Sequence, residues 1–323
     1  MLSSMFSNPI LLGLFLVVGL VLLVKGADRL VDGASSLARR LGVSNLVIGL
    51  TIVAFGTSMP EFVVNMVSVV DGATDLAITN ILGSNTINTL VILGCSAIVC
   101  PLAAQKSTVR VDVPLNILAG VLVLVFVFVT LPTETKGLSR IEGITLILVF
   151  AGFLVYTFRA AKKDAATTAE SVRLPLWECI VNILIGLTSL VVGGEMIVKS
   201  AVAIARYCGV AESVIGLTIV ALGTSLPELA TSVVAAFKRN NDIAIGNVVG
   251  SNIFNVFFIL GTSATIKFLP VYSGIELDAA LVAFSSITVR LLLLNRKRSI
   301  SRWGGAVLVV LYAAYLTYRL LSY

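Results

Sequence analysis

The sequence predicts an all-α polytopic membrane protein, with ten transmembrane helices as two inverted five-helix repeats. The first observation behind this prediction is composition: 58% of the 323 residues are hydrophobic, only 12% are charged, and the mean hydropathy is +1.04. Soluble domains carry about 25% charged residues. Apolar runs of about 20 residues, the length that spans a bilayer, follow one another along nearly the whole chain. The other two observations are an internal duplication and the distribution of basic residues.

The duplication is nearly exact over one long segment. Ile48–Glu61 returns as Ile215–Glu228, with 12 of 14 positions identical and a constant offset of 167 residues. The similarity fades in the last two helices of each half, which we expect to form scaffold. The same offset also aligns Gly26–Asp28 with Gly193–Glu195, Ala38–Arg39 with Ala205–Arg206, Asp75 with Asp242, and Gly83–Asn85 with Gly250–Asn252.

Each half contains five apolar runs. The first run, Pro9 to Val24, is followed rather than preceded by a basic residue, which is the reverse of a signal peptide, so we expect a retained helix. The second run of each half carries the long duplicated segment, the third carries Gly-Ser-Asn, and the last two are plainer. The predicted helices are 9–31, 43–70, 74–100, 110–131 and 140–160, then 176–199, 210–237, 242–268, 276–294 and 302–321.

Five spans per half is an odd number, so the second copy enters the membrane from the opposite face. The predicted organisation has two repeats joined by a polar linker that lies on the cytoplasmic side. The first repeat is 1–160, with motifs at 49–66 and 77–94; the linker is 161–175; the second repeat is 176–323, with motifs at 216–233 and 244–261.

The basic residues test this topology. When the loops are numbered alternately, 17 Lys and Arg residues fall on one face and 6 on the other. By the positive-inside rule the first face is cytoplasmic, so both termini are predicted outside a bacterial-type inner membrane. The net charge of +6 is thus explained by topology, and nucleic acid is not an expected partner. We also expect no cofactor and no obligate protein partner beyond the lipid bilayer.

The second helix of each half combines a proline with polar residues and one glutamate. Pro60 lacks an N–H and crowds the carbonyl of Gly56, so the helix should kink or break there, leaving carbonyls near Ala54 to Thr57 without full backbone partners. In a bilayer such carbonyls are tolerated only when a cation or water satisfies them. Thr57, Ser58 and Glu61 can share one face, and Thr224, Ser225, Pro227 and Glu228 repeat the set.

The third helix of each half adds an amide and a hydroxyl. Ser84 and Asn88 are four residues apart, as are Ser251 and Asn255, so each pair lies on one helix face. Gly83 and Gly250 are predicted to let a neighbouring helix approach closely.

Taken together, these side chains offer a metal ion oxygen atoms and amide groups only. The chain has no histidine, so this chemistry suits hard cations such as Ca²⁺ and Na⁺. Two glutamates match a divalent charge, and without a cation at least one of two close carboxylates should take up a proton. A site that cannot stay empty favours exchange over a leak.

Each feature also has a structural interpretation. A membrane proline with Ser and Thr often marks only a kink, and Gly-Ser-Asn often marks helix packing. The duplicated combination favours a site instead. Asp28 and Glu195 have basic neighbours and are interpreted as structural charges near helix ends. Asp75 and Asp242 follow loops, where they could cap helix starts or line an ion entrance.

The two Gly-Thr-Ser-x-Pro-Glu segments and the two Gly-Ser-Asn-x-x-Asn segments resemble the alpha repeats of the calcium/cation antiporter superfamily, most closely prokaryotic sodium/calcium exchangers. The resemblance spans the whole chain and implies a midplane site, one Ca²⁺ position flanked by Na⁺ positions, with alternating access as the first helix of each half slides across the rest. It implies central carboxylates at Glu61 and Glu228, and Ca²⁺ ligation by the carbonyls of Thr57 and Thr224. The Na⁺ positions would use Ser58, Ser225, Ser84 and Ser251 with the carbonyls of Ala54 and Ala221, and Asn88 and Asn255 would complete the centre.

Two departures bear on the coupled ion. Some members carry Asp at the position of Asn255, an acid tied to Na⁺ or K⁺ use, and the proton-coupled branch typically has Gly-Asn where this chain has Gly-Thr-Ser. The expected function is a secondary-active antiporter, not an enzyme, that exchanges Na⁺ for Ca²⁺. Exchange of Ca²⁺ or another divalent ion such as Mn²⁺ for H⁺ is the alternative. An intramembrane enzyme with a Ser/His dyad would need a histidine, and the chain has none. A passive channel is the last alternative, but inverted halves with central acidic residues fit an exchanger better.

Overall fold

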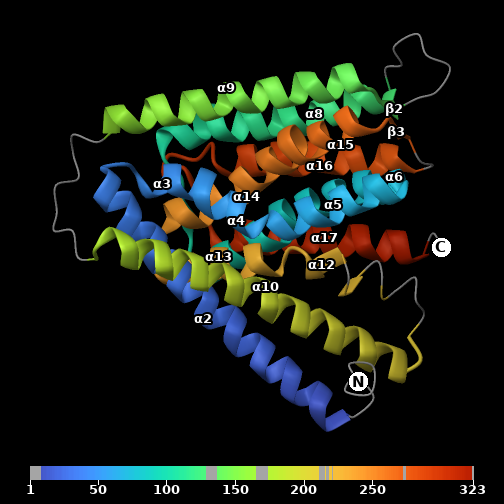
Figure 1. Ribbon diagram of the computed structural model, residues 1–323. Coiled ribbons are helices and arrows are strands. Elements are labelled where there is room, and N and C mark those ends of the chain that lie inside the picture. Colours follow the sequence, from blue (N-terminus) through green and yellow to red (C-terminus); the bar gives the residue numbers. More distant parts are fainter. Residues whose placement is uncertain are drawn as a thin grey trace.

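The computed structural model describes residues 9–128, 137–164, 174–210, 215, 218–219, 221–271 and 274–321. Nearly all of these residues are helical, and helices from the two halves of the chain pack against one another throughout the molecule (Figure 1). A long pair, α2 and α10, lies along one side of the remaining bundle in this view. Helices α8 and α9 lie at the opposite side.

The long pair consists of α2 (Pro9–Leu41) and α10 (Leu176–Tyr207). Both helices continue past their predicted ends at 31 and 199; in α2 the added turns are held by buried residues such as Ala34, Leu37 and Ala38. The two helices run antiparallel with glycine at their contacts. A Cβ added to Gly26 would lie 2.9 Å from the carbonyl oxygen of Gly186, and one added to Gly186 would lie 2.8 Å from that of Gly26.

The second predicted helix of the first half is broken, as its proline predicts. It begins as α3 (Asn45–Ile48), passes through a π-helical segment η1 (Gly49–Val53) into α4 (Ala54–Thr57), and resumes after Ser58 as α5 (Met59–Asp71). The axis bends by 46° at this break. In the second half, α12 (Ala221–Gly223) and α13 (Leu226–Phe237) repeat the break, and most of 211–220 lies outside the described residues.

The third helix of each half forms the centre of the bundle. The first is α6 (Thr74–Thr86), η2 (Ile87–Ile92) and α7 (Leu93–Val99); the second is α14 (Asn241–Ile253), η6 (Phe254–Leu260) and α15 (Gly261–Ile266). Both π-helical segments begin at equivalent positions. The most apolar windows of these helices are 78% and 94% buried, which identifies them as the core.

Short strands next to the outer helices join the two halves. The outer helices are α8 (Val113–Phe128), which continues the π-helical segment η3 (Thr108–Asp112), α9 (Arg140–Asp164), α16 (Ile275–Leu292) and α17 (Arg302–Leu321). Strand β1 (Leu102–Ala103) pairs antiparallel with β4 (Ser299–Ile300), and β2 (Gly137–Leu138) pairs antiparallel with β3 (Leu269–Pro270). Each pair therefore ties one strand from the first half to one from the second.

The count of membrane-crossing helices falls short of the predicted ten in the described part of the chain. Seven helices are long and apolar enough to cross, and the bent pair Asn45–Thr57 with Met59–Asp71 makes an eighth. Of the two other expected spans, the second half's counterpart of the bent pair contributes α13, a 12-residue helix that begins after the break, and most of 211–220 before it lies outside the described residues. The other, Ile275–Leu292, carries Glu276, Asp278 and Arg290. The ten-helix inverted arrangement and the domain limits remain predictions.

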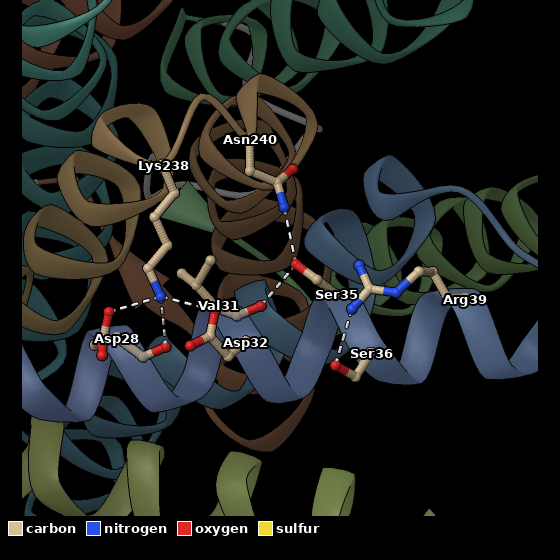
Figure 2. Close-up of polar contacts among 8 residues, drawn as sticks. All are labelled: Asp28, Val31, Asp32, Ser35, Ser36, Arg39, Lys238 and Asn240. Atoms are coloured by element: carbon tan, nitrogen blue, oxygen red, sulfur yellow. Dashed lines mark hydrogen bonds and ion pairs between the residues drawn. The ribbon is translucent and has the colours of Figure 1, made fainter. Parts of the chain in front are cut away.

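The turn between α13 and α14 is anchored to α2 by polar contacts (Figure 2). Lys238 Nζ lies 2.6 Å from Asp28 Oδ1 and 2.7 Å from Asp32 Oδ1. Asn240 Nδ2 donates to Ser35 Oγ over 2.8 Å. Asp28 is thus a structural charge, but it lies inside a long helix and its partner comes from the other half. Glu195 pairs within its own helix with Lys199 over 2.6 Å.

Neither Asp75 nor Asp242 caps a helix start, so that prediction is wrong. The N-cap residues of α6 and α14 are Ala73 and Asn240, and the side chain of Asn240 accepts from the Ile243 backbone N–H over 3.3 Å. Asp242 lies in the first turn of α14, where its Oδ2 accepts from Gln105 Nε2 over 2.7 Å.

Candidate cation site

Two glutamates lie in the interior of the bundle, in the first turns of α5 and α13. Glu61 and Glu228 are both 0% exposed. Each follows a proline in the first turn, where the missing N–H costs no helical hydrogen bond. A carboxylate at this end of a helix also interacts favourably with the helix dipole. The break therefore places one acidic group at a new helix start inside the protein, once in each half.

Crossed hydrogen bonds bring the two carboxylates into one site. Ser58 Oγ of the first half donates to Glu228 Oε1 over 2.7 Å, and Ser225 Oγ of the second half donates to Glu61 Oε1 over 3.4 Å. Both serines are buried. Each carboxylate is thus held by a serine from the other half, which is the reciprocal contact expected of two related segments that face each other.

The Ala54 carbonyl keeps a backbone partner, whereas the sequence predicts carbonyls near Ala54 to Thr57 without full backbone partners. It accepts from the Ser58 backbone N–H over 3.1 Å, Thr57 Oγ1 over 3.3 Å and Ser251 Oγ over 3.5 Å. The break lies between Thr57 and Met59, inside the stretch from Gly56 to Pro60 where it was predicted. The Ala54 carbonyl also brings Ser251 of α14 against α4. Gly250 makes this possible, because a Cβ there would lie 2.7 Å from the Leu50 oxygen.

The close approach predicted at Gly83 has no counterpart among the described residues, none of which lies within 4 Å of a Cβ built there. Ala221 begins α12, and its predicted carbonyl role stays a prediction.

Several candidate residues keep a buried side-chain oxygen that no hydrogen bond from the described residues reaches. These atoms are Glu61 Oε2, Glu228 Oε2, Ser84 Oγ, Asn88 Oδ1 and Asn255 Oδ1. Buried polar atoms are normally paired, because an unpaired one costs about 1–3 kcal/mol. Unpaired carboxylate, hydroxyl and amide oxygens are the kind of donor that a hard cation takes.

Any cation site here needs uncharged oxygen ligands in addition to the two carboxylates. Among the described residues, no group of three or more His, Cys, Asp or Glu is placed to hold a metal ion. With two carboxylates only, hydroxyl, amide and backbone oxygens have to supply the remaining ligands. This matches the predicted set, in which every member apart from the two glutamates is neutral.

Amides from the two central helices form a network behind the site that sequence reasoning missed in part. Asn255 Nδ2 donates to Asn85 Oδ1 over 3.0 Å, Asn85 Nδ2 donates to the Asn252 carbonyl over 3.2 Å, and Asn252 Nδ2 donates to Thr89 Oγ1 over 2.8 Å. Asn85 and Asn252 are the last residues of the repeated Gly-Ser-Asn segments, so their duplication was the available signal. Their contacts hold the backbone of α6 and α14 together and orient the Asn255 amide.

Asn247 is a second omission. It lies on α14 and contacts both Thr57 and the Glu228 backbone. Its duplication as Asn80, at the same offset of 167, was a signal that the motifs did not include.

A cavity of about 490 Å³ lies beside the site on the α10 side. Its lining is mostly apolar and includes Pro60, Val63, Val198, Thr224 and Pro227. Glu195 and Lys199 also border it. Thr224 belongs both to this cavity and to the predicted cation ligands, so the cavity reaches the edge of the site from one side.

Comparison with known proteins gives a consistent result over the whole chain. The family described as sodium/calcium exchanger protein matches residues 11–159 and 179–321. The sodium/calcium exchanger MaX1 of Methanosarcina acetivorans is 31% identical over 94% of this chain and 97% of its own. The inner membrane protein YrbG of Escherichia coli is 38% identical over 78% of each chain.

Solved structures agree with the sequence comparison. A structure of the sodium-calcium exchanger NCX_Mj soaked with Na⁺ and Sr²⁺ superposes with a TM-score of 0.82 at 31% identity, covering 96% of this chain and 99% of that one. A structure of the same exchanger soaked without Na⁺ and Ca²⁺ gives a TM-score of 0.81 at 30% identity.

Proposed function

Because the chain belongs to the sodium/calcium exchanger protein family and is an integral membrane antiporter, we propose that it exchanges Na⁺ for Ca²⁺ at a site built around Glu61 and Glu228. The observation that carries this proposal is the pair of buried carboxylates held by serines from opposite halves. Burying two ionised carboxylates is costly unless positive charge compensates them. One Ca²⁺, or Na⁺ ions in its place, supplies that charge.

The ligand chemistry supports this choice of ions. Ca²⁺ takes six to eight oxygens, and carboxylates can contribute two each. In the proposal, Glu61 and Glu228 bind Ca²⁺ together with backbone oxygens of Thr57 and Thr224. Ser58, Ser84, Ser225 and Ser251, with the carbonyls of Ala54 and Ala221, serve Na⁺ positions, and Asn88 and Asn255 complete the centre. Occupancy by Ca²⁺ and by Na⁺ is mutually exclusive because both need the same carboxylates.

In this proposal the protein has ten spans in two inverted halves, and ions reach the centre from the two faces in turn. The helices α2 and α10 slide together across the rest of the bundle. Two features support this: the pair packs through small residues at Gly26 and Gly186, and the cavity beside α10 reaches Thr224. The basic residues favour a cytoplasmic Lys238 face with both termini outside, and the name of the Escherichia coli relative supports an inner-membrane location.

The test is Na⁺-gradient-driven uptake of ⁴⁵Ca²⁺ into proteoliposomes. An outward Na⁺ gradient should drive uptake by the wild-type protein, and replacement of internal Na⁺ by choline should abolish it. Retained uptake in Glu61→Ala or Glu228→Ala would contradict the site assignment. No Na⁺-dependent uptake by active protein would contradict the function.

Exchange of Ca²⁺ or Mn²⁺ for H⁺ is the second candidate, because the unpaired oxygens of the two carboxylates could also carry protons. A pH gradient without Na⁺ discriminates the two. Uptake that follows the pH gradient alone would favour this alternative.

A further inference from the structure

Asn247 is a buried amide that contacts both halves of the site. Its side chain is 0% exposed. Thr57 Oγ1 donates to Asn247 Oδ1 over 3.0 Å, and Asn247 Nδ2 donates to the Glu228 backbone carbonyl over 3.3 Å and to Ser232 Oγ over 2.9 Å. Thr57 precedes one carboxylate and Glu228 carries the other. One side chain therefore ties together the two broken-helix segments that bear the acidic groups.

The equivalent residue of the first half, Asn80, makes different contacts. Asn80 Nδ2 donates to Asn65 Oδ1 over 2.8 Å, and Asn65 Nδ2 donates to the Ala77 carbonyl over 3.1 Å. Both bonds stay within the first half. Thr224, which is the equivalent of Thr57, interacts through its side chain with Glu61 rather than with Asn80. In the described part of the chain, the link from this amide position to the other half is therefore made on the Asn247 side alone.

The two halves differ in sequence at this contact. The residue that meets the amide is Asn65 in the first half and Ser232 in the second, at the same offset of 167. Asn65 presents a carbonyl oxygen that accepts the Asn80 amide and is itself anchored by its own amide group. Serine is shorter and leaves the Asn247 side chain free to reach Thr57 across the interface.

We propose that Asn247 is a positioning residue of the cation site, an inference that rests on the proposed Na⁺/Ca²⁺ exchange. A threonine hydroxyl has one donor and two acceptor lone pairs. The one Thr57 proton lies within reach of the Asn247 oxygen, 3.0 Å away, and of the Ala54 carbonyl, 3.3 Å away; the shorter bond to Asn247 holds the residue whose backbone oxygen is proposed to bind Ca²⁺. The bond to the Glu228 carbonyl also fixes the first turn of α13. Asn247 thereby sets the separation between Thr57 and Glu228.

If Asn247 positions the site, its removal should weaken Ca²⁺ binding more than it slows turnover. Asn247→Ala removes both links and should raise the apparent KM for Ca²⁺ about tenfold, with Vmax changed less than about threefold. Asn80→Ala is the matched control and should leave KM within about twofold of wild type, since its bonds do not reach the site. Ser232→Asn supplies the residue that the first half carries; by drawing the Asn247 amide away from Thr57 it should raise KM about threefold.

The experiment measures KM and Vmax of Na⁺-driven ⁴⁵Ca²⁺ uptake, together with the Ca²⁺-dependent shift in unfolding temperature of each purified variant. A double-mutant cycle with Thr57→Val separates positioning from general destabilisation. In the Thr57→Val background, Asn247→Ala should add no more than about twofold to KM, because the shared bond is already lost.

Three results would overturn the proposal: an Asn247→Ala KM within about twofold of wild type, an equal effect of Asn80→Ala, or full additivity with Thr57→Val. If the Asn247→Ala variant does not fold, the Ser232→Asn variant tests the proposal instead, and an unchanged KM for Ca²⁺ in that variant counts against it. Failure of the exchange function looks different. Wild-type protein would then show no Na⁺-driven uptake, while the order of Ca²⁺-dependent thermal shifts among the variants would still test Asn247.

Discussion

The segments Thr57–Glu61 and Thr224–Glu228 differ at one residue, yet they lie in different surroundings. Thr57 is fully buried and bonded to Asn247, whereas Thr224 borders the cavity beside α10 and interacts with Glu61. Ser58 lies 2.7 Å from its glutamate partner and Ser225 lies 3.4 Å from its own. The shared sequence produces the same break and the same carboxylate position. The residues that pack around each segment differ between the halves, and they determine how tightly the segment is held.

The largest expected effect comes from removing either charge. Glu61→Gln and Glu228→Gln keep the side-chain shape but halve the negative charge of the site, so each should lower Na⁺-driven Ca²⁺ uptake by more than about 100-fold, in line with the cost of unbalancing a buried charge. The measurement is initial ⁴⁵Ca²⁺ uptake in proteoliposomes. Glu195→Gln, at an exposed carboxylate, is the control and should retain uptake.

Equal loss in both glutamine variants would show that the asymmetry between the halves stops short of the carboxylates. If one variant kept more than a tenth of wild-type uptake, the two acids would not form a common centre, and the comparison would extend to the site itself.

Substitutions of Ser58 and Ser225 should affect Ca²⁺ binding to different extents. Ser58→Ala removes the shorter bond and should weaken Ca²⁺ binding about tenfold, since hydrogen bonds to charged groups are worth about 1.5–3 kcal/mol and part of this is recovered by the ion. Ser225→Ala removes the longer bond and should cost about threefold or less. Titration of Ca²⁺ by calorimetry in detergent measures both. A larger loss at Ser225 would reverse the comparison.

The contact between α2 and α10 is one place where the halves should behave alike. Gly26→Ala and Gly186→Ala each push a methyl group to within 3 Å of the other helix's backbone, so both should lower stability by about 1–3 kcal/mol. Gly152→Ala is the control, because no described atom lies within 4 Å of a Cβ there. Thermal unfolding in detergent provides the measurement, and unequal shifts at Gly26 and Gly186 would contradict the reciprocal packing.

Much of the fold was predictable because its signals are local. The apolar runs fix the helices, and Pro60 and Pro227 fix the breaks. Helix ends were less predictable: α2 continues to Leu41 because Ala34, Leu37 and Ala38 bury against the bundle, which depends on the neighbouring helices. The helix N-caps were misassigned for a similar reason, since Asn240 rather than Asp242 faces the open N–H groups of α14.

The site was predictable where duplication marked it and less so elsewhere. The residues around Glu61 and Glu228 fall in the repeated motifs, and the crossed serine bonds link them. The bonding of the Ala54 carbonyl was not predictable, because its third donor, Ser251, comes from another helix. Asn247 and Asn80 occupy equivalent positions in the repeat but bond to different partners, Ser232 and Asn65 among them, so their contacts could be told apart only in three dimensions.

The smallest expected effect concerns two lysines that differ in how they connect the helices. Lys238 bridges the end of α13 to Asp28 and Asp32 of α2, whereas the ion pair that Lys199 makes within the described part of the chain is with Glu195, one turn away on its own helix. Exposed ion pairs contribute about 0.2–1 kcal/mol each, so Lys238→Met should lower the free energy of unfolding by about 1 kcal/mol and Lys199→Met by less than about half of that. Thermal unfolding at low and high salt measures both, and the Lys238 effect should shrink as salt screens it.

The pH dependence gives this prediction a sign. Partial burial disfavours the charged lysine, but bonds to Asp28 and Asp32 outweigh that effect and raise the pKa of Lys238 above its ordinary value. A group whose folded pKa is raised contributes stability fully below its unfolded pKa, about 10.4 for lysine, and loses it as the pH rises through the folded value. The gap between wild type and Lys238→Met should therefore stay constant from pH 7 to pH 9 and close only above about pH 10.4. A gap that closes below pH 9 would mean that the lysine charge is not what joins the α13–α14 turn to α2.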